Sequence, residues 1–169
     1  AGITELREKR GNLFRMGISM YGQMPSGNLL HPPILKEALT FKSCIVQLQD
    51  YASNTPIGYG RTFITGRQTR VATIAVGYAD GYSRLLSNRG DVLIGGQRAP
   101  IIGNVCMDMI MADVTEIKNV DLYDEVILIG KQGREYISAS EVADWMGTIN
   151  YEVTSIISKR VPRYYHESE

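Results

Sequence analysis

Short runs of strand-forming residues, each followed by glycine or another turn residue, fill most of this chain. Phe41 to Tyr51 alternates between apolar and polar residues, and Val71 to Val76 is apolar and partly β-branched. Val92 to Ile94 meets Ala99 to Ile102 across two glycines, which predicts a hairpin. Many short strands with turn signals between them favour a mainly β fold, a closed or Greek-key β-barrel.

Two further strands and a change to helix are predicted in the second half of the chain. Val105 to Val114 and Glu125 to Ile129 are the strands, and Lys131-Gln132-Gly133 is a turn after them. Ser138 to Glu141 has the spacing of a capping box, which predicts a helix start. Val142, Trp145 and Met146 would then share one helical face. Asn150 to Ile157 predicts a second short helix.

The first part of the chain has a different pattern. Leu13 to Met20 is an apolar run of the kind that a buried strand uses, and Gly22 to Pro33 is rich in glycine and proline, as in a linker. The length allows one full domain and part of another. We therefore expect a boundary here, with one part over residues 1–37 and a β-barrel domain over residues 38–169.

Composition argues against several classes of partner. The 169 residues include 18 basic and 18 acidic side chains, so the net charge is zero and no nucleic-acid-binding surface is expected. No apolar stretch reaches the roughly 20 residues that cross a bilayer, and the first ten residues are too charged for a signal peptide. Cys44 and Cys106 lack metal-type spacing and are expected to be reduced, buried thiols. A cytoplasmic protein without a metal is predicted.

Four segments place a phenol or a carboxylate beside a glycine or another small residue, where a ligand can approach the backbone closely. They are Ile57 to Phe63 with Tyr59, Val76 to Tyr82 with Tyr78, Cys106-Met107-Asp108, and Ile149 to Val153 with Tyr151. A phenol has an ordinary pKa of about 10, so it acts as a base only when a cation or a hydrogen bond stabilises the phenolate. These segments indicate a site but do not name its reaction.

In order and spacing, these segments and Leu13 to Gly22 resemble the C-terminal part of alanine racemase, over about Arg15 to Pro162. That family consists of pyridoxal-phosphate enzymes with an N-terminal (β/α)8 barrel and a C-terminal β domain. The resemblance implies a Greek-key-like β-barrel domain, preceded by a short remnant of the cofactor-binding barrel and followed by one or two short helices. It also implies interconversion of L- and D-alanine, which supplies D-alanine for peptidoglycan.

The resemblance assigns catalysis to Tyr59 and substrate binding to Tyr78, Met107 and Asp108. Racemisation needs one proton-transfer group on each face of the substrate carbanion. The family uses a barrel lysine and a tyrosine from the other subunit, and Tyr59 matches that tyrosine. Tyr78 matches the tyrosine of the channel through which substrate reaches the site. Met107 and Asp108 match residues beside the substrate carboxylate.

Cofactor-binding roles are implied for Arg15, Gly17, Ile18 and Tyr151. Arg15 matches an arginine that donates a hydrogen bond to the pyridine nitrogen, which then stays unprotonated and makes the ring a weaker electron sink. Gly17 and Ile18 match backbone amides that bind the phosphate, and Tyr151 matches a hydroxyl at the same phosphate. In a head-to-tail homodimer these four residues would serve their own subunit, while the catalytic and substrate-binding residues would serve the neighbour.

The chain departs from the family pattern in three ways. Gly58 stands where serine is common, and Met109 stands where glutamine is usual. None of the chain's six lysines lies in a segment that resembles the family's cofactor-lysine motif. We therefore expect the isolated chain to bind pyridoxal phosphate weakly or not at all, and not to racemise.

Three other functions are weighed against alanine racemisation. A serine/alanine racemase of the vancomycin-resistance type shares this domain, although Tyr151 favours the alanine enzyme. A non-catalytic β-barrel interaction module would need the four segments only as turns. An oligonucleotide-binding barrel is disfavoured because the chain lacks a basic stripe and a ladder of exposed aromatic residues.

Overall fold

The structure is a computed structural model that describes residues 12–13, 15–25 and 29–166. The chain divides into two compact units, Ala1–Leu39 and Thr40–Glu169. Each unit is described by itself.

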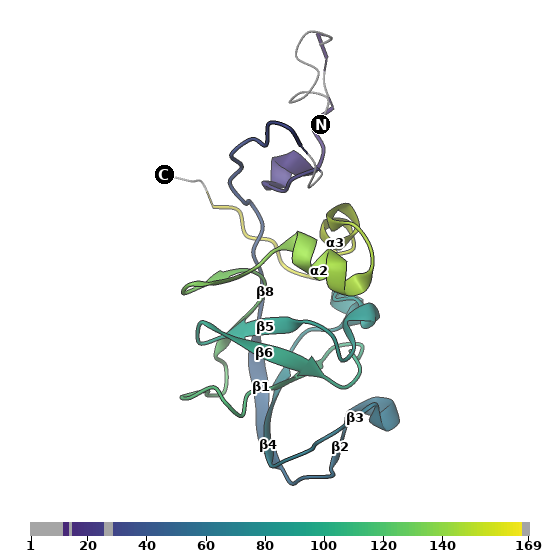
Figure 1. The fold of residues 1–169 in the computed structure, drawn as a ribbon, viewed down its shortest axis with the longest axis vertical. Helices are drawn as coiled ribbons and strands as arrows, with labels where there is room; N and C mark the ends of the chain where they lie inside the picture. The colour runs from purple at the N-terminus through teal and green to yellow at the C-terminus, as the bar shows by residue number, and fades with distance from the viewer. Residues whose placement is uncertain (1–11, 14, 26–28, 167–169) are drawn as a thin grey trace. The chain divides into compact units, whose positions relative to one another are not determined.

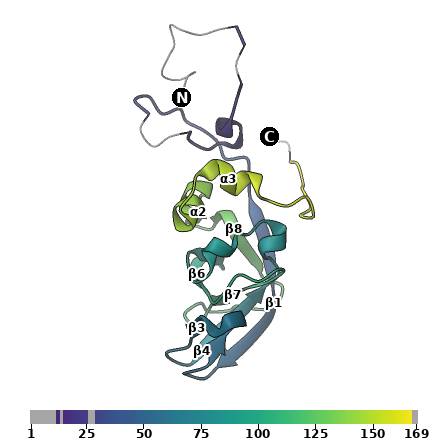
Figure 2. The ribbon, with the colours of Figure 1, turned by 90° about the vertical axis from the view of Figure 1, so that its right-hand side faces the viewer.

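The larger unit is a closed antiparallel β-barrel (Figures 1 and 2). Its strands follow one another around the barrel in the order β1, β4, β7, β6, β5 and β8, and a β1–β8 pairing closes the ring. Closure leaves these strands without a free edge. The strands are β1 (Phe41–Tyr51), β4 (Thr69–Ile74), β5 (Asp91–Ile94), β6 (Gln97–Ile102), β7 (Ile110–Asp113) and β8 (Glu125–Gln132). The prediction of a mainly β, Greek-key-like barrel is confirmed.

Strand β1 closes the barrel because it pairs on both of its sides. Residues Phe41 to Cys44 pair with β8, and Ile45 to Tyr51 pair with β4. The register shifts between Phe41 and Lys42 and again between Ile45 and Gln47. Such bulges bend a strand and increase its twist, which a strand shared by two sides of a small barrel requires.

The predicted hairpin between β5 and β6 is present. Ile94 pairs with Gln97, so Gly95 and Gly96 form a two-residue loop with φ of +58° and +74°. Positive φ at both loop residues is typical of a type I′ turn, which glycine adopts without strain. The next hairpin joins β8 to β9 (Glu135–Ile137), and here Gln132 pairs with Glu135. The turn therefore consists of residues 133–134, whereas the sequence predicts it at residues 131–133.

Two short helices cover one end of the barrel (Figure 1). Helix α2 (Ala139–Met146) begins at Ser138, whose hydroxyl accepts a hydrogen bond from the Glu141 N–H, as predicted. Its buried face and Val153 of α3 (Asn150–Ser155) belong to the barrel core. Both predicted helices are therefore confirmed.

Arg98 of β6 ties the barrel to the first of these helices. Its guanidinium lies 3.0 Å from Glu135, 2.7 Å from Glu141 and 3.5 Å from Asp91, and it also donates to the Tyr136 carbonyl. These partners belong to β5, β9 and α2. The hydrogen bond to Glu141, followed by that to Glu135, raises the pKa of Arg98 despite partial burial.

Two strand predictions are wrong. Residues Val105 to Met109, predicted as the first half of a strand, form a turn in which the Cys106 N–H donates to the Met109 carbonyl at 2.9 Å. Leu13 to Met20 contains no strand among its described residues; Ile18–Tyr21 is instead the 3-10 helix η2. An apolar run forms a strand only where a neighbouring strand can accept its hydrogen bonds, and the described part of this unit contains none.

The smaller unit has its own internal contacts. The Ala38 N–H donates to the Tyr21 carbonyl, and the Gln23 amide donates to Glu37 at 2.7 Å. Burial raises the pKa of Glu37, and the bond from Gln23 opposes that shift. Gly22, with φ of +76°, ends η2. These contacts fold the chain back on itself after η2.

Three sequence expectations concern particular side chains and spans. Cys44 and Cys106 are free thiols as expected, but both are half-buried rather than buried. Among the described residues, no cluster of histidine, cysteine, aspartate or glutamate side chains could hold a metal ion. No helix in the described part of the chain has the length and apolar character needed to span a bilayer.

Candidate active site

Tyr59 lies in the loop of a small hairpin that the sequence did not reveal. Strands β2 (Pro56–Ile57) and β3 (Phe63–Ile64) pair with each other, and residues 58–62 join them. Gly58 and Gly60 have φ of +69° and +75°, which favours glycine at both positions. A Cβ at Gly58 would lie 2.6 Å from the Met111 methyl carbon. The loop therefore packs closely on the barrel while the Tyr59 side chain is 78% exposed.

Two asparagines fasten this loop to the segment that follows β6. The Asn104 amide donates to the Tyr59 carbonyl at 2.7 Å. The Asn88 amide donates to the Thr62 hydroxyl at 3.2 Å, and its oxygen accepts from the Gly103 N–H at 2.6 Å. The position of Tyr59 is thus set by hydrogen bonds to residues far away in the sequence.

Tyr78 lies in a second tight turn, the 3-10 helix η4 (Tyr78–Asp80). The Tyr78 N–H donates to the Cys106 carbonyl and the Ala79 N–H donates to the Met107 carbonyl, both at 3.0 Å. A Cβ at Gly77 would overlap both of these carbonyl oxygens. The glycine is therefore required by close backbone approach, which brings the Tyr78 turn directly against Met107.

Arg160, from the segment after α3, bridges two carboxylates beside these turns. Its Nε donates to Asp80 Oδ1 at 2.7 Å, and a terminal guanidinium nitrogen donates to Asp108. The other Asp80 oxygen accepts from the Gly77 N–H at 2.9 Å. The bonds to Asp80 and then Asp108 raise the pKa of Arg160. Asp80 thereby closes the turn that carries Tyr78 and also binds the arginine.

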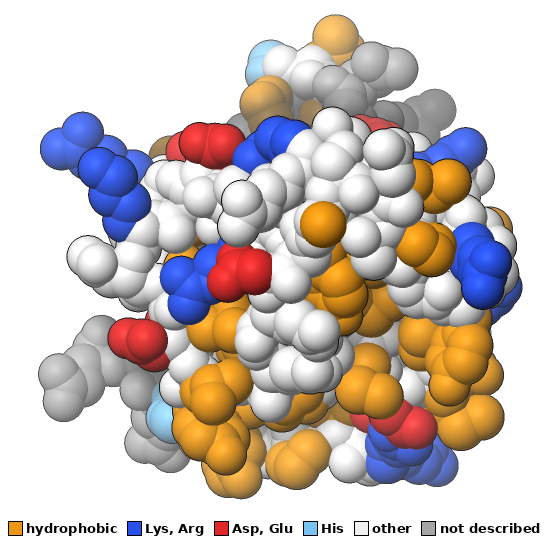
Figure 3. All heavy atoms as spheres, turned by 90° about the horizontal axis from the view of Figure 1, so that it is seen from below, with side chains coloured by type: hydrophobic (Ala, Val, Ile, Leu, Met, Phe, Trp, Pro, Cys, Tyr) orange, Lys and Arg blue, Asp and Glu red, His pale blue; other side chains and the backbone are white. Residues whose placement is uncertain are grey.

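Segment 104–109 therefore connects the predicted catalytic and substrate-binding residues. We call residues 57–63, 76–82 and 104–109 the motif loops. Hydrogen bonds join the loops of Tyr59 and Tyr78 to the segment that carries Met107 and Asp108, and all four residues are exposed. Hydrophobic side chains reach the surface among charged ones where the domain is seen from below (Figure 3). Exposed phenols beside a carboxylate and a cation can bind a small charged ligand and exchange protons with it.

A further arginine binds the main chain of the motif loops. Arg84 donates to the Val105 carbonyl at 3.3 Å, just before Cys106.

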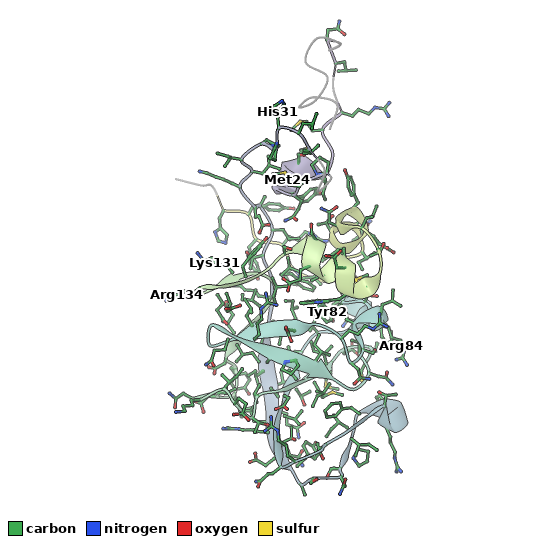
Figure 4. All side chains as sticks on the ribbon, viewed as in Figure 1. Met24, His31, Tyr82, Arg84, Lys131 and Arg134 are labelled. Atoms are coloured by element: carbon green, nitrogen blue, oxygen red, sulfur yellow. The ribbon has the colours of Figure 1, made fainter. Side chains whose placement is uncertain are left out.

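In Figure 4, Tyr82 lies between the helices and the barrel strands, whereas Arg84 lies at the edge of the domain. Tyr82 is 2% exposed, and burial raises its pKa, with a smaller contribution from Asp91. Tyr82 thus belongs to the core rather than to the site.

The predicted cofactor-binding residues lie elsewhere in the chain. Tyr151 is the second residue of α3 and its side chain is 40% exposed. Arg15 and Gly17 are exposed residues of the smaller unit, and Ile18 begins η2 and is buried. Arg15, Gly17 and Ile18 belong to the smaller unit, and Tyr151 belongs to the larger one.

Sequence reasoning missed Asn88, Asn104 and Arg160. The asparagines follow no repeating pattern, although Asn104 comes directly after a glycine with φ of +76°. Arg160 is separated from Asp80 by 80 positions and from Asp108 by 52. No local signal could therefore have identified its partners.

Comparison with known proteins identifies the family. The family model for the C-terminal domain of alanine racemase matches residues 38–165, most of the chain. The chain belongs to the alanine racemase C-terminal domain family. It is 50% identical over 165 residues to alanine racemase from Halothermothrix orenii and 48% identical over 166 residues to that from Syntrophobacter fumaroxidans. Each match covers 98% of this chain but 44% of the relative, so the chain spans less than half the length of these relatives.

Solved alanine racemase structures agree with this assignment. The Enterococcus faecalis enzyme superposes with a TM-score of 0.91 at 37% identity, over 98% of this chain and 44% of that one. The Bacillus anthracis enzyme with bound L-Ala-P gives 0.83 at 41% identity, over 89% and 39%. The Bartonella henselae enzyme with covalently bound pyridoxal phosphate gives 0.80 at 35% identity, over 88% and 40%. The resemblance predicted from the motifs is confirmed.

Proposed function

We propose that this chain is the C-terminal part of a pyridoxal-phosphate-dependent alanine racemase that interconverts L- and D-alanine. The observation that carries the proposal is the position of Tyr59: an exposed phenol whose main chain is bonded to Asn104, at the start of the segment that contains Met107 and Asp108. The alanine racemase relatives support the same reaction.

Tyr59 is the proton-transfer group on one face of the substrate. As the phenolate, its oxygen takes a proton from the α-carbon in one direction; as the phenol, it donates that proton to the α-carbon in the other direction. When bound, pyridoxal phosphate supplies the electron sink that delocalises the charge left on that carbon. The loop that carries this phenol is tightly held, so the phenol can extend into a partner's site and keep a fixed orientation there. A fixed orientation of the reacting groups favours proton transfer.

Tyr78, Met107 and Asp108 orient the substrate beside Tyr59. The main-chain N–H groups of Met107 and Asp108 would bind the substrate carboxylate, because such groups need little reorganisation to bind an anion. The Tyr78 N–H bonds to the carbonyl of Cys106, the residue before the Met107–Asp108 turn. The Tyr78 side chain would therefore narrow the path by which the substrate reaches the turn. Together these residues bind the amino acid by its carboxylate and fix its α-carbon near the phenol.

Arg15, Gly17, Ile18 and Tyr151 form a donor set suited to the cofactor. Arg15 and the Tyr151 hydroxyl are exposed donors, and the N–H groups that begin a helical turn have no acceptor within it. None of the four carries a negative charge that would repel a phosphate. Arg15 would hold the ring nitrogen, and the other three would hold the phosphate.

The catalytic unit is a homodimer in this proposal. Residues 1–37 belong to the cofactor-binding barrel, residues 38–169 form the C-terminal domain, and the motif loops complete the partner's site. The exposure of Tyr59, Tyr78 and Met107 fits a surface that a second subunit covers. The product would be D-alanine for peptidoglycan, made in the cytoplasm.

A fusion enzyme tests the proposal. Residues 1–169 are joined to the barrel portion of the Halothermothrix orenii racemase in place of its matching C-terminal part. With pyridoxal phosphate, this fusion enzyme is expected to form D-alanine from L-alanine, whereas the 169-residue chain alone is not. Faster turnover of L-serine than of L-alanine would favour the serine/alanine racemase. A fusion enzyme that folds and binds the cofactor but racemises neither amino acid would contradict the proposal.

A further inference from the structure

The segment after α3 is seated firmly against the turn that carries Tyr78. The Ser158 N–H donates to the Asp80 carbonyl at 2.9 Å, and a Cβ at Gly81 would overlap the Ile156 carbonyl oxygen. Gly81 also has φ of +93°, so its conformation favours glycine as well. The start of the segment therefore has a defined position relative to Asp80.

Two arginines of this segment have different tasks. The Arg163 guanidinium donates to three main-chain carbonyls of the same segment, those of Ile157, Ser158 and Val161, at 3.0 to 3.1 Å. Arg163 thus shapes the segment from within. Arg160 instead reaches out of the segment and binds the side chains of Asp80 and Asp108.

The charge around the Met107–Asp108 turn depends on Arg160. Asp108 is half exposed, with 52% side-chain exposure, and Asp80 is 15% exposed. Without a cation, these two carboxylates would repel any anion that approaches the turn, because like charges repel each other. A bound arginine between them offsets one of the two negative charges and fixes the direction of the Asp108 side chain.

We propose that Arg160 is a positioning residue that neutralises Asp108, so that the carboxylate of the substrate can bind at the Met107–Asp108 turn. The proposal rests on the function proposed above. Arg160 does not touch the substrate itself; it acts through Asp108. The C-terminal segment, which carries none of the residues predicted from the sequence, is thereby part of the substrate-binding apparatus.

Binding of propionate to the fusion enzyme tests the proposal directly, since propionate has the carboxylate of alanine but no amine. Arg160→Gln removes the charge and keeps a hydrogen-bonding side chain. Titration calorimetry should show propionate binding weakened about tenfold, less so at high salt, where exposed charges are screened. The KM for L-alanine should rise by a similar factor while kcat changes by less than about threefold.

The double variant Arg160→Gln/Asp108→Asn separates charge from structure. If Arg160 acts by neutralising Asp108, removing both charges restores propionate binding to within about threefold of the unmodified fusion enzyme. Lys159→Gln removes a neighbouring exposed charge and should leave binding unchanged. Unaltered binding in Arg160→Gln, or a loss that the second substitution does not rescue, would overturn the proposal. Calorimetry needs no turnover, so absent racemisation with intact propionate binding would count against the proposed function alone.

Discussion

The motif loops and the helix-covered end of the barrel are stabilised in different ways. In the motif loops, the side chains of Tyr59, Tyr78 and Met107 are 78%, 42% and 53% exposed, and the backbone is held by hydrogen bonds and close glycine contacts. Around α2, Val142 and Ala143 are each 2% exposed within the core. Substitutions in the first region should therefore reduce activity, and substitutions in the second should reduce stability.

Gly77→Ala should break this separation, because it should lower both activity and stability. Because the new methyl group would meet two main-chain oxygens rather than a flexible side chain, the Tyr78 turn must move away from Met107. We expect racemisation by the fusion enzyme to fall more than about 100-fold and the free energy of unfolding to fall by about 3 kcal/mol. Rate assays and urea denaturation measure the two effects.

Gly66→Ala is the matched control for that substitution. Gly66 is exposed, and a Cβ there would meet nothing within 4 Å. It should change neither quantity. Similar losses in both variants would mean that the close approach at Gly77 has no special importance.

Arg98→Ala tests the second region, the helix-covered end of the barrel. It removes the shared partner of Asp91, Glu135 and Glu141 and leaves three carboxylates near one another. The free energy of unfolding should fall by about 2 kcal/mol, while kcat of the folded fusion enzyme stays within twofold. Lys42→Ala, which breaks an exposed pair with Glu125, should cost less than about 0.5 kcal/mol in the same urea denaturation. Equal costs would contradict the role assigned to Arg98.

Asn104→Ala tests whether hydrogen bonding alone holds the catalytic loop. Loss of the bond to the Tyr59 carbonyl should lower kcat about tenfold, with a change in unfolding free energy of no more than about 1 kcal/mol. Asn104→Asp keeps the shape but lacks the N–H donor, so its kcat should fall similarly. Full activity in the aspartate variant would show that the donor is dispensable.

Tyr82→Phe should have the smallest effect, and it should raise the free energy of unfolding rather than lower it. The Tyr82 hydroxyl is buried without a hydrogen-bond partner among the described residues, so its removal should stabilise the chain by up to about 1 kcal/mol. Because burial raises the pKa of Tyr82, stability should also fall as pH rises above about 10, where the unfolded tyrosine ionises first, and the variant should lose that component. Tyr164→Phe, at an exposed tyrosine, should change neither.

The sequence predicted the regular parts of the barrel because their signals are local. Alternation over Phe41 to Tyr51 and the Gly95-Gly96 pair depend on neighbouring residues alone, and both predictions are confirmed. Val105 to Val114 misled because Cys106, Met107 and Met109 are apolar in type, yet they form a turn. Strands β2 and β3 have two residues each, too few to show a period.

In the candidate site, too, residues with a local sequence signal could be predicted and residues joined by long-range contacts could not. Tyr59, Tyr78, Met107 and Asp108 could be predicted because each lies in a short motif. The groups that hold them could not, since Asn104 is 45 positions from Tyr59 and Arg160 is farther still from Asp80. Such contacts depend on the closed barrel, which brings distant loops together. The roles of the four residues, and those of Arg15, Gly17, Ile18 and Tyr151, stay predictions.

The racemisation rate of the Tyr59→Phe fusion enzyme tests the central claim most directly. The substitution removes the hydroxyl and keeps the ring, and the side chain is 78% exposed, so the melting temperature should not change. The rate should fall by about 100- to 10,000-fold, the usual contribution of a general acid or base. Tyr123→Phe, at a tyrosine that is 77% exposed, should keep full activity. A Tyr59→Phe enzyme that racemises alanine within twofold of the unmodified rate would contradict the account.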